Sequence, residues 1–255
     1  MTVYVIGAGP GAPDLITVRG AEILGRCHTC LYAGSLVPEE LLQRCPPEGV
    51  RINTARMPLD EIVGHIVDAD AAGHDVARLH SGDPSLYSAM TEQRRALAAF
   101  GIDVEIVPGV PAFAAAAAAL GTELTVPGVA QSLLVTRVST LSTDMPDGED
   151  LGSLAATGVT LALHLAAHRA EQIVEALAPH YGLDCPTATV AFASRDDEQI
   201  VRCPLGELPE RLSENGISRT AVIFVGRVLG SEPPGRLDSY LYSQARMSKL
   251  RRDHG

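Results

Sequence analysis

The sequence predicts an α/β protein built from two domains, each with a sheet covered by helices. Short apolar runs at residues 3–6, 76–79 and 104–107 are typical of buried strands. Between them lie segments of helical periodicity, most clearly over residues 59–67, where apolar side chains recur at the spacing of one helix face. The length of 255 residues is close to the size at which one core stops growing, so two domains are expected.

The elements of the first half follow one another as strand and helix. Thr17 is placed to cap the first helix, Pro38 suits the first turn of the second, and Gly73 and Gly101 end the third and fourth. This alternation predicts a mainly parallel sheet with helices on both faces. The expected strands cover residues 3–6, 27–32, 76–79 and 104–107. The expected helices are residues 18–26, a helix that contains Leu41 and Leu42, a helix with an apolar stripe over residues 59–67, and a segment ending at residue 100.

The second half continues in the same style after an alanine-rich helix over residues 112–120. Gly121 and the Pro127-Gly128 pair indicate a boundary, so we expect domains over residues 1–120 and 121–230. From Ser231 the sequence is polar and basic, and residues 231–255 are expected to form a surface tail. The second domain is expected to have strands near 133–135, 159–163, 187–193 and 221–225, and helices near 169–178 and 208–214.

The composition excludes several classes of function. A formal net charge of −11 without a basic stripe argues against nucleic acid as a partner. The absence of a long apolar run argues against a membrane span, and the first residues lack the pattern of an export signal. Five cysteines in a chain of this length argue against a disulfide framework. These observations predict a cytoplasmic protein.

Three glycine-bearing loops each follow an apolar strand, at residues 7–13, 81–84 and 108–111. Because ligands of such sheets bind outside the carboxyl ends of the strands, these loops are expected to form a ligand site. The loop Ser81-Gly82-Asp83-Pro84 also offers a carboxylate that can accept a hydrogen bond from a hydroxyl or amine of the ligand.

The first loop, Gly7-x-Gly9-x-Gly11, is compatible with a dinucleotide site, a different ligand site or a plain structural turn. A dinucleotide fingerprint needs a third glycine where this chain has Ala12, and it needs a ribose-binding acid that residues 27–36 do not contain. Pro10 also removes an N–H donor. A nicotinamide-dependent oxidoreductase is therefore the weaker alternative.

No metal site is expected from the sequence. Cys27-x-x-Cys30 lies in an expected strand, where the two thiols would face opposite sides of the sheet, so buried structural cysteines are predicted. The pair His164 and His168 lacks the glutamate of a zinc protease motif. The acidic run at residues 196–198 is interpreted as a solvated turn.

Three segments together resemble the tetrapyrrole methyltransferase family. Residues 7–17, 78–84 and 107–110 carry its G-A-G-P-G-x-P-D-L-I-T, R-L-x-x-G-D-P and V-P-G-V sequences in order, and the resemblance extends to about Gly230. Residues 31–37, 53–55 and 81–87 are most similar to the members that act in corrin biosynthesis, with members for other ring positions as alternatives. Where Thr-Arg-x-Ser-Gly-Arg is expected, residues 136–141 read Thr-Arg-Val-Ser-Thr-Leu.

The resemblance implies a V-shaped pair of α/β domains, a cleft for S-adenosylmethionine and a tetrapyrrole, and a homodimer. It implies direct methyl transfer without a catalytic triad, and no general base is assigned; a binding module without turnover is the alternative. Arg56 and Arg137 are the candidates for binding substrate carboxylates. The implied cofactor-binding residues are Pro13, Ser81, Gly82, Asp83 as the main polar anchor, Leu86, Pro111, Ala112, Leu165, Phe192 and Ala221.

Overall fold

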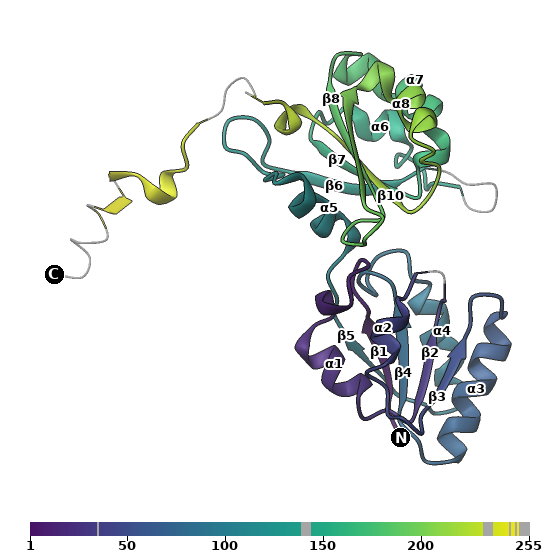
Figure 1. The fold of residues 1–255 in the computed structure, drawn as a ribbon. Helices are drawn as coiled ribbons and strands as arrows, with labels where there is room; N and C mark the ends of the chain where they lie inside the picture. The colour runs from purple at the N-terminus through teal and green to yellow at the C-terminus, as the bar shows by residue number, and fades with distance from the viewer. Residues whose placement is uncertain (35, 139–143, 232–236, 245, 248, 250–255) are drawn as a thin grey trace. The chain divides into compact units, whose positions relative to one another are not determined.

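The computed structural model describes residues 1–34, 36–138, 144–231, 237–244, 246, 247 and 249. The chain forms two compact units, each with its own sheet (Figure 1). The first unit comprises Met1–Ala115 and Phe192–Asp197, and the second comprises Ala116–Ala191 and Glu198–Gly255.

The sheet of the first unit is parallel throughout, with the strand order β3-β2-β4-β1-β5. This confirms the predicted parallel sheet. The edge strand β3 was missed by the sequence analysis, because it is only four residues long and its side chains are largely exposed. The strands are β1 (Val3–Gly7), β2 (Thr29–Tyr32), β3 (Val50–Asn53), β4 (Val76–His80) and β5 (Val104–Val107).

Helices cover both faces of this sheet, as predicted. One buried cluster joins α1 and α2 to the sheet, and a second joins α3 and α4 to the opposite face. Thr17 caps α1 by accepting a hydrogen bond from the backbone N–H of Gly20 at 3.1 Å. The helices are α1 (Val18–Leu24), α2 (Glu39–Leu42), α3 (Leu59–Ala71), α4 (Met90–Ala98) and α5 (Ala112–Leu120), which runs from the first unit into the second.

The sheet of the second unit is mixed, with the order β6-β7-β10-β8-β9. Only β6 and β7 pair in parallel. The unit is the α/β domain that the sequence predicts, without any prediction of its strand directions. The chain direction reverses at a hairpin, in which β9 pairs antiparallel with β8. Neither β9 nor α6 was predicted from the sequence. The elements are β6 (Leu133–Arg137), α6 (Leu151–Ala155), β7 (Thr160–His164), α7 (Ala170–Tyr181), β8 (Pro186–Ala191), β9 (Gln199–Pro204), α8 (Leu208–Glu214) and β10 (Ala221–Val225).

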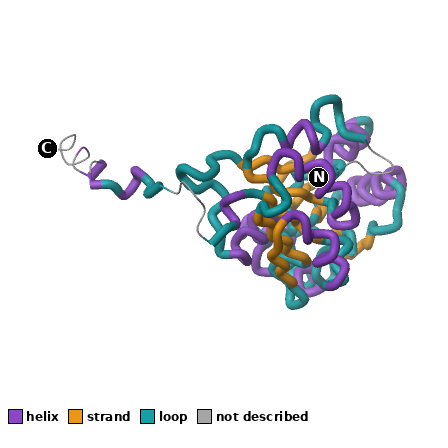
Figure 2. The backbone as a smooth tube through the Cα atoms, turned by 90° about the horizontal axis from the view of Figure 1, so that it is seen from above, coloured by secondary structure: helices purple, strands orange, loops and turns teal. Residues whose placement is uncertain are grey.

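Short 3-10 helical turns lie between the longer elements and after β10. Figure 2 draws helices in purple, strands in orange and loops in teal. Within residues 237–244 the exposed side chains include Leu237 and Tyr240, and the N–H of Leu237 donates to the carbonyl of Pro127 at 3.0 Å. In the described ranges no helix has the length and apolar character needed to cross a membrane. The turns are η1 (Pro13–Leu15), η2 (Ala167–Arg169), η3 (Leu205–Glu207), η4 (Arg227–Leu229) and η5 (Tyr240–Tyr242).

The five cysteines are all free and buried, so the prediction that Cys27 and Cys30 are buried is confirmed. The prediction that Cys27 and Cys30 face opposite sides of the sheet was wrong, because β2 begins only at Thr29 and Cys27 lies before it. Both residues join Cys45 in the buried cluster under α1 and α2. Among the described residues, no group of three His, Cys, Asp or Glu side chains is arranged to hold a metal ion.

Candidate functional site

The three predicted glycine loops of the first unit meet at the carboxyl edge of its sheet. Gly9 and Gly82 exchange backbone hydrogen bonds, with N···O distances of 3.3 and 2.7 Å. The third loop is attached through Gly109, whose N–H donates to Oδ2 of Asp83 at 2.8 Å. Loops that are far apart in the sequence thus form one continuous rim.

Glycine is required where these loops touch. A Cβ added to Gly7 would lie 2.5 Å from Cα of Gly109 and 2.7 Å from the carbonyl oxygen of Gly82. Gly82 itself has φ +66°, a conformation that side chains other than glycine rarely adopt. The backbone of one loop therefore rests directly on the backbone of the other two.

Asp83 holds two of the loops through its carboxylate. Oδ2 accepts the N–H of Gly109, and Oδ1 accepts the N–H of Ser85 at 2.8 Å as well as the Ser85 hydroxyl. Partial burial raises the pKa of Asp83, but the hydrogen bonds from Ser85 and Gly109 outweigh this and hold it below its ordinary value. Asp83 is therefore ionised at neutral pH and has lone pairs left for a ligand.

The neighbours of Asp83 in the predicted site are also at this rim. Ser81 and Gly82 follow β4 directly, and the N–H of Leu86 donates to the carbonyl of Asp83 at 3.2 Å. A Cβ on Gly82 would lie 3.7 Å from both Cα of Pro111 and N of Ala112, at the start of α5. The structure thus brings five predicted residues together near Asp83: Ser81, Gly82, Leu86, Pro111 and Ala112.

A segment from the second half of the chain, which begins at Phe192, packs against the first glycine loop close to Pro13. Pro13 begins η1 at the end of the first loop, and the N–H of the preceding Ala12 donates to the Ser194 hydroxyl at 3.0 Å. A Cβ on Gly11 would lie 2.9 Å from the carbonyl oxygen of Ala193. Residues 192–197, which contain Phe192, therefore pack against the first loop within the first unit.

The remaining predicted cofactor residues lie in the second unit, at one edge of its sheet. Leu165 follows β7, and Ala221 begins β10 opposite Ala191, the last residue of β8. Because β10 runs antiparallel to both neighbours, its start lies at the edge where β7 and β8 end. The antiparallel pairing, which the sequence analysis did not foresee, is what groups these positions.

Backbone strain is concentrated at the predicted cofactor positions. Left-handed backbone in non-glycine residues costs on the order of 1–3 kcal/mol each, and such residues cluster at functional sites. Two of them are predicted cofactor residues, and each of the others lies within three positions of Leu86, Phe192 or Ala221. In the described part of the chain these residues are Tyr87 (φ 53°), Ala89 (φ 52°), Leu165 (φ 53°), Phe192 (φ 52°), Ser194 (φ 67°) and Thr220 (φ 51°).

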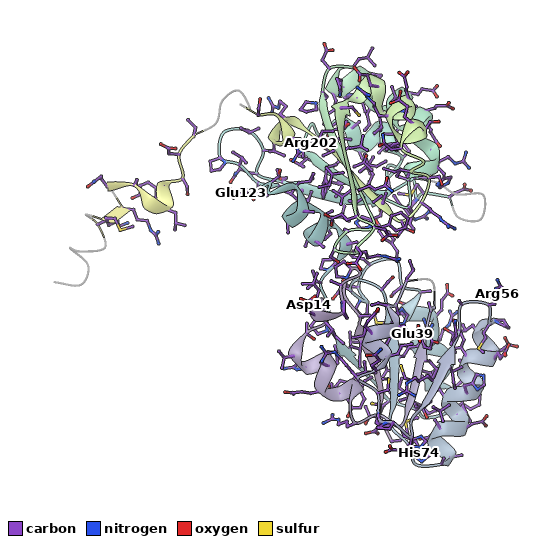
Figure 3. All side chains as sticks on the ribbon, viewed as in Figure 1. Asp14, Glu39, Arg56, His74, Glu123 and Arg202 are labelled. Atoms are coloured by element: carbon purple, nitrogen blue, oxygen red, sulfur yellow. The ribbon has the colours of Figure 1, made fainter. Side chains whose placement is uncertain are left out.

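The two candidate substrate arginines are in different units. Arg56 is exposed in the turn between β3 and α3, and Figure 3 shows it with Asp14 and Glu39 at the end of the first unit opposite to His74. Arg137 ends β6 and donates to the carbonyl of Val138 at 3.3 Å. The Thr140-Leu141 difference from the family pattern lies outside the described residues.

A cavity of about 540 Å³ was missed by the residue-level sequence analysis. It lies where β2 and β3 end, and the polar residues after these strands are the signal that could have indicated it. That signal was hidden because β3 was not predicted. One wall is Arg51, whose Nε donates to the carbonyl of Leu42 at 3.1 Å. The lining residues are Tyr32, Gly34, Val37, Glu39, Leu42, Gln43, Arg51 and Asn53.

Together these features define a class: α/β proteins of two units that present tightly packed backbone loops and strained residues at the edges of their sheets. Such edges bind small ligands through peptide groups and a few polar side chains.

The sequence model of the family Tetrapyrrole (Corrin/Porphyrin) Methylases matches residues 2–209, so the chain belongs to this family. Membership confirms the predicted fold class and the methyltransferase activity, and it sets aside the nicotinamide-dependent oxidoreductase.

Relatives and solved structures agree with this assignment. The chain is 61% identical to a precorrin-4 C(11)-methyltransferase of Rhodococcus erythropolis over 247 residues, covering 96% of this chain and 98% of that protein. The structure of a cobalt precorrin-4 methyltransferase has a TM-score of 0.87 at 39% identity, covering 90% of this chain and 96% of the other. A uroporphyrin-III C-methyl transferase of Thermus thermophilus, complexed with S-adenyl homocysteine, has a TM-score of 0.73 at 28% identity, covering 92% and 98%.

Proposed function

We propose that this protein transfers a methyl group from S-adenosylmethionine to C11 of precorrin-4 in cobalamin biosynthesis. One structural observation supports the methyl donor site: the residues with left-handed backbone lie at or near the cofactor positions that the family resemblance implies. The substrate is supported by the relatives, since identity is 61% to the precorrin-4 enzyme of Rhodococcus erythropolis and 41% to a cobalt-precorrin-4 enzyme of Methanocaldococcus jannaschii. The metal-free precorrin is therefore the proposed substrate.

The residues present fit the methyl donor. The three glycine loops are packed backbone to backbone, and Asp83 supplies a partly exposed, ionised carboxylate beside them. Asp83 is the proposed polar anchor for a hydroxyl or ammonium group of the donor. The proposed contacts are Pro13, Ser81, Gly82, Asp83, Leu86, Pro111, Ala112, Leu165, Phe192 and Ala221.

When bound, S-adenosylmethionine would supply an electrophilic methyl group: the substrate carbon would bond to it as the methyl–sulfur bond breaks, and S-adenosylhomocysteine would be the leaving group. The contribution of the chain is positioning. Loops tied by Asp83 and by the Gly9 and Gly82 hydrogen bonds hold their backbone groups in one arrangement. Holding two reactants in line can supply ~7–11 kcal/mol of the barrier. No proton-transferring side chain is needed for the displacement itself.

The substrate is a polycarboxylate, and Arg56 and Arg137 are the proposed partners for its acidic side chains. The cavity at the ends of β2 and β3 is proposed as part of its binding surface, because Tyr32 and Asn53 in its wall belong to segments that resemble corrin-pathway members. We place the protein in the cytoplasm as a homodimer, in line with its five free cysteines and its family.

Label transfer tests the proposal directly. The protein is incubated with precorrin-4 and methyl-labelled S-adenosylmethionine, and the product is analysed by mass and NMR. We expect one methyl group at C11. Methylation at another ring carbon would refute the assigned position, and no transfer despite binding of S-adenosylhomocysteine would favour a binding module without turnover.

A further inference from the structure

Asn53 holds the loop after β2 and keeps its amide nitrogen available for a ligand. Its Oδ1 accepts the N–H of Gly34 and the N–H of Ala55, each at 3.1 Å. Only the oxygen of an amide can accept, so these two bonds fix which end of the side chain is Nδ2. Within the described residues both hydrogen bonds of this side chain are made by Oδ1, and the two N–H groups of Nδ2 are left for a ligand.

Gly34 is the residue against which this amide rests. A Cβ added to Gly34 would lie 2.2 Å from Nδ2 of Asn53, so a residue with a side chain would displace the amide. The contact also locates Nδ2, because Gly34 and Asn53 both line the cavity of about 540 Å³ at the ends of β2 and β3. Asn53 is exposed and Gly34 is partly exposed. A ligand that enters the cavity therefore meets Nδ2 at its wall.

The polar lining of the cavity lies on the face of the sheet that α2 covers. Arg51 reaches the carbonyl of Leu42 at the end of α2, and Asn53, two residues further along β3, points to the same side. Tyr32 pairs with Asn53 across β2 and β3 and packs against the buried cluster under α1 and α2. The amide of Asn53 and the phenol of Tyr32 are thus neighbours on the wall, and no part of the sheet separates them from the cavity.

The charged residues of the cavity wall are Arg51 and Glu39, whose formal charges cancel. In the described ranges no carboxylate lies within ion-pair distance of Arg51, because the ion pairs found there belong to other arginines. Its guanidinium is held in place by backbone carbonyls, those of Leu42, Cys45, Pro46 and Gly49. Since the wall has no net charge, a ligand anion must be selected by directed hydrogen bonds rather than by overall attraction.

We propose that Nδ2 of Asn53, with the Tyr32 hydroxyl and the charge of Arg51 beside it, binds one carboxylate of the tetrapyrrole substrate and so helps to fix which ring position faces the methyl donor. The inference rests on the proposed function, because that function supplies a polycarboxylate ligand for this cavity. Glu39 repels a second carboxylate, so the subsite takes one acid group. The methyl donor also carries a carboxylate, and the experiment separates the two sources.

Asn53→Asp tests the inference with almost no change of shape. The new side chain still accepts from Gly34 and Ala55 through Oδ1, but a carboxylate oxygen replaces the donor Nδ2 and repels a ligand carboxylate. The probes are uroporphyrin III, a stable tetrapyrrole polycarboxylate followed by absorbance, and S-adenosylhomocysteine followed by calorimetry. Asn215→Asp, at an exposed residue that ends α8, makes the same change of net charge elsewhere and is the matched control.

We expect Asn53→Asp to weaken uroporphyrin III binding roughly tenfold or more, and Asn215→Asp to leave it unchanged. Glu39→Gln removes the anion of the wall and should strengthen this binding about threefold to tenfold. Tyr32→Phe should weaken it by about the same factor, because one neutral hydrogen bond is lost. Binding of S-adenosylhomocysteine should stay within about threefold of wild type in all four variants.

Uroporphyrin III affinity that is unchanged in Asn53→Asp, or lowered equally in Asn215→Asp, would overturn the inference. A selective loss of S-adenosylhomocysteine binding would also overturn it, by assigning the amide to the donor carboxylate. If Asn53→Asp does not fold, Glu39→Gln and Tyr32→Phe decide, since they must change the affinity in opposite directions. If the wild-type protein binds only S-adenosylhomocysteine, the KM for precorrin-4 in label transfer replaces the affinity in the same comparison. Failure of the wild-type protein to bind either probe would instead count against the proposed function.

Discussion

Gly7→Ala tests whether the close packing of the three loops is essential to the site. Gly7 ends β1 with an ordinary backbone conformation, so alanine adds steric contact without strain in φ. The new Cβ would lie 2.5 Å from both N and Cα of Gly109, and 2.7 Å from O of Gly82. Carbon atoms pack at about 3.5–4.0 Å, so the neighbouring backbone must retreat by about 1 Å.

The expected cost follows from this displacement. Overpacking of this kind costs about 1–3 kcal/mol, and the smaller entropy of the unfolded alanine chain returns less than about 1 kcal/mol. We expect the free energy of unfolding to fall by about 2 kcal/mol, with a lower midpoint in thermal melts. A shift of about 1 Å in the reactant-binding loops can cost about 100-fold in rate, so kcat/KM for methyl transfer should fall by that order.

The matched control is Gly64→Ala. Gly64 lies inside α3, and a Cβ there would meet no atom within 4 Å. Alanine should therefore stabilise the protein by about 0.5–1 kcal/mol with unchanged activity. The reasoning would be refuted if Gly7→Ala melted with wild type and bound S-adenosylhomocysteine with the same affinity, since the three loops would then tolerate separation.

Three further predictions concern single polar side chains. Asp83→Asn should lower the affinity for S-adenosylhomocysteine in calorimetry and destabilise the protein by about 1 kcal/mol, because an amide cannot accept from both Gly109 and Ser85; wild-type affinity would exclude Asp83 as the anchor. Burial, and then the charge of Arg78, lower the pKa of His80 from 6.5 to about 4, which contributes stability that is present above pH 6.5 and is lost as the pH falls toward 4, by about 2 kcal/mol at pH 5. Urea unfolding of His80→Gln should show a smaller loss over this range, while the exposed His168→Gln should follow wild type. Arg137→Ala should weaken uroporphyrin III binding or alter the methylated position, and an unchanged product at unchanged affinity would remove Arg137 from the site.

Much of the fold and of the site could be predicted from the sequence because the relevant signals are local. The apolar spacing of α3 and the cap at Thr17 depend on residues within one or two turns of helix. The glycine loops of the first unit could be located because each directly follows an apolar strand. β3 and β9 were missed because both are edge strands with several exposed residues, which weakens the apolar pattern.

The sequence by itself determined that the chain has α/β units, where their glycine loops lie, and which family's motifs they carry. The tertiary structure alone decided that Gly7, Gly82 and Gly109 touch, that the second sheet is mixed, that three cysteines share one cluster, and that Arg78 is buried beside His80. The physical reason is that strand order, burial and backbone contact arise from packing between segments far apart in the chain. Local periodicity carries no information about which of these segments become neighbours.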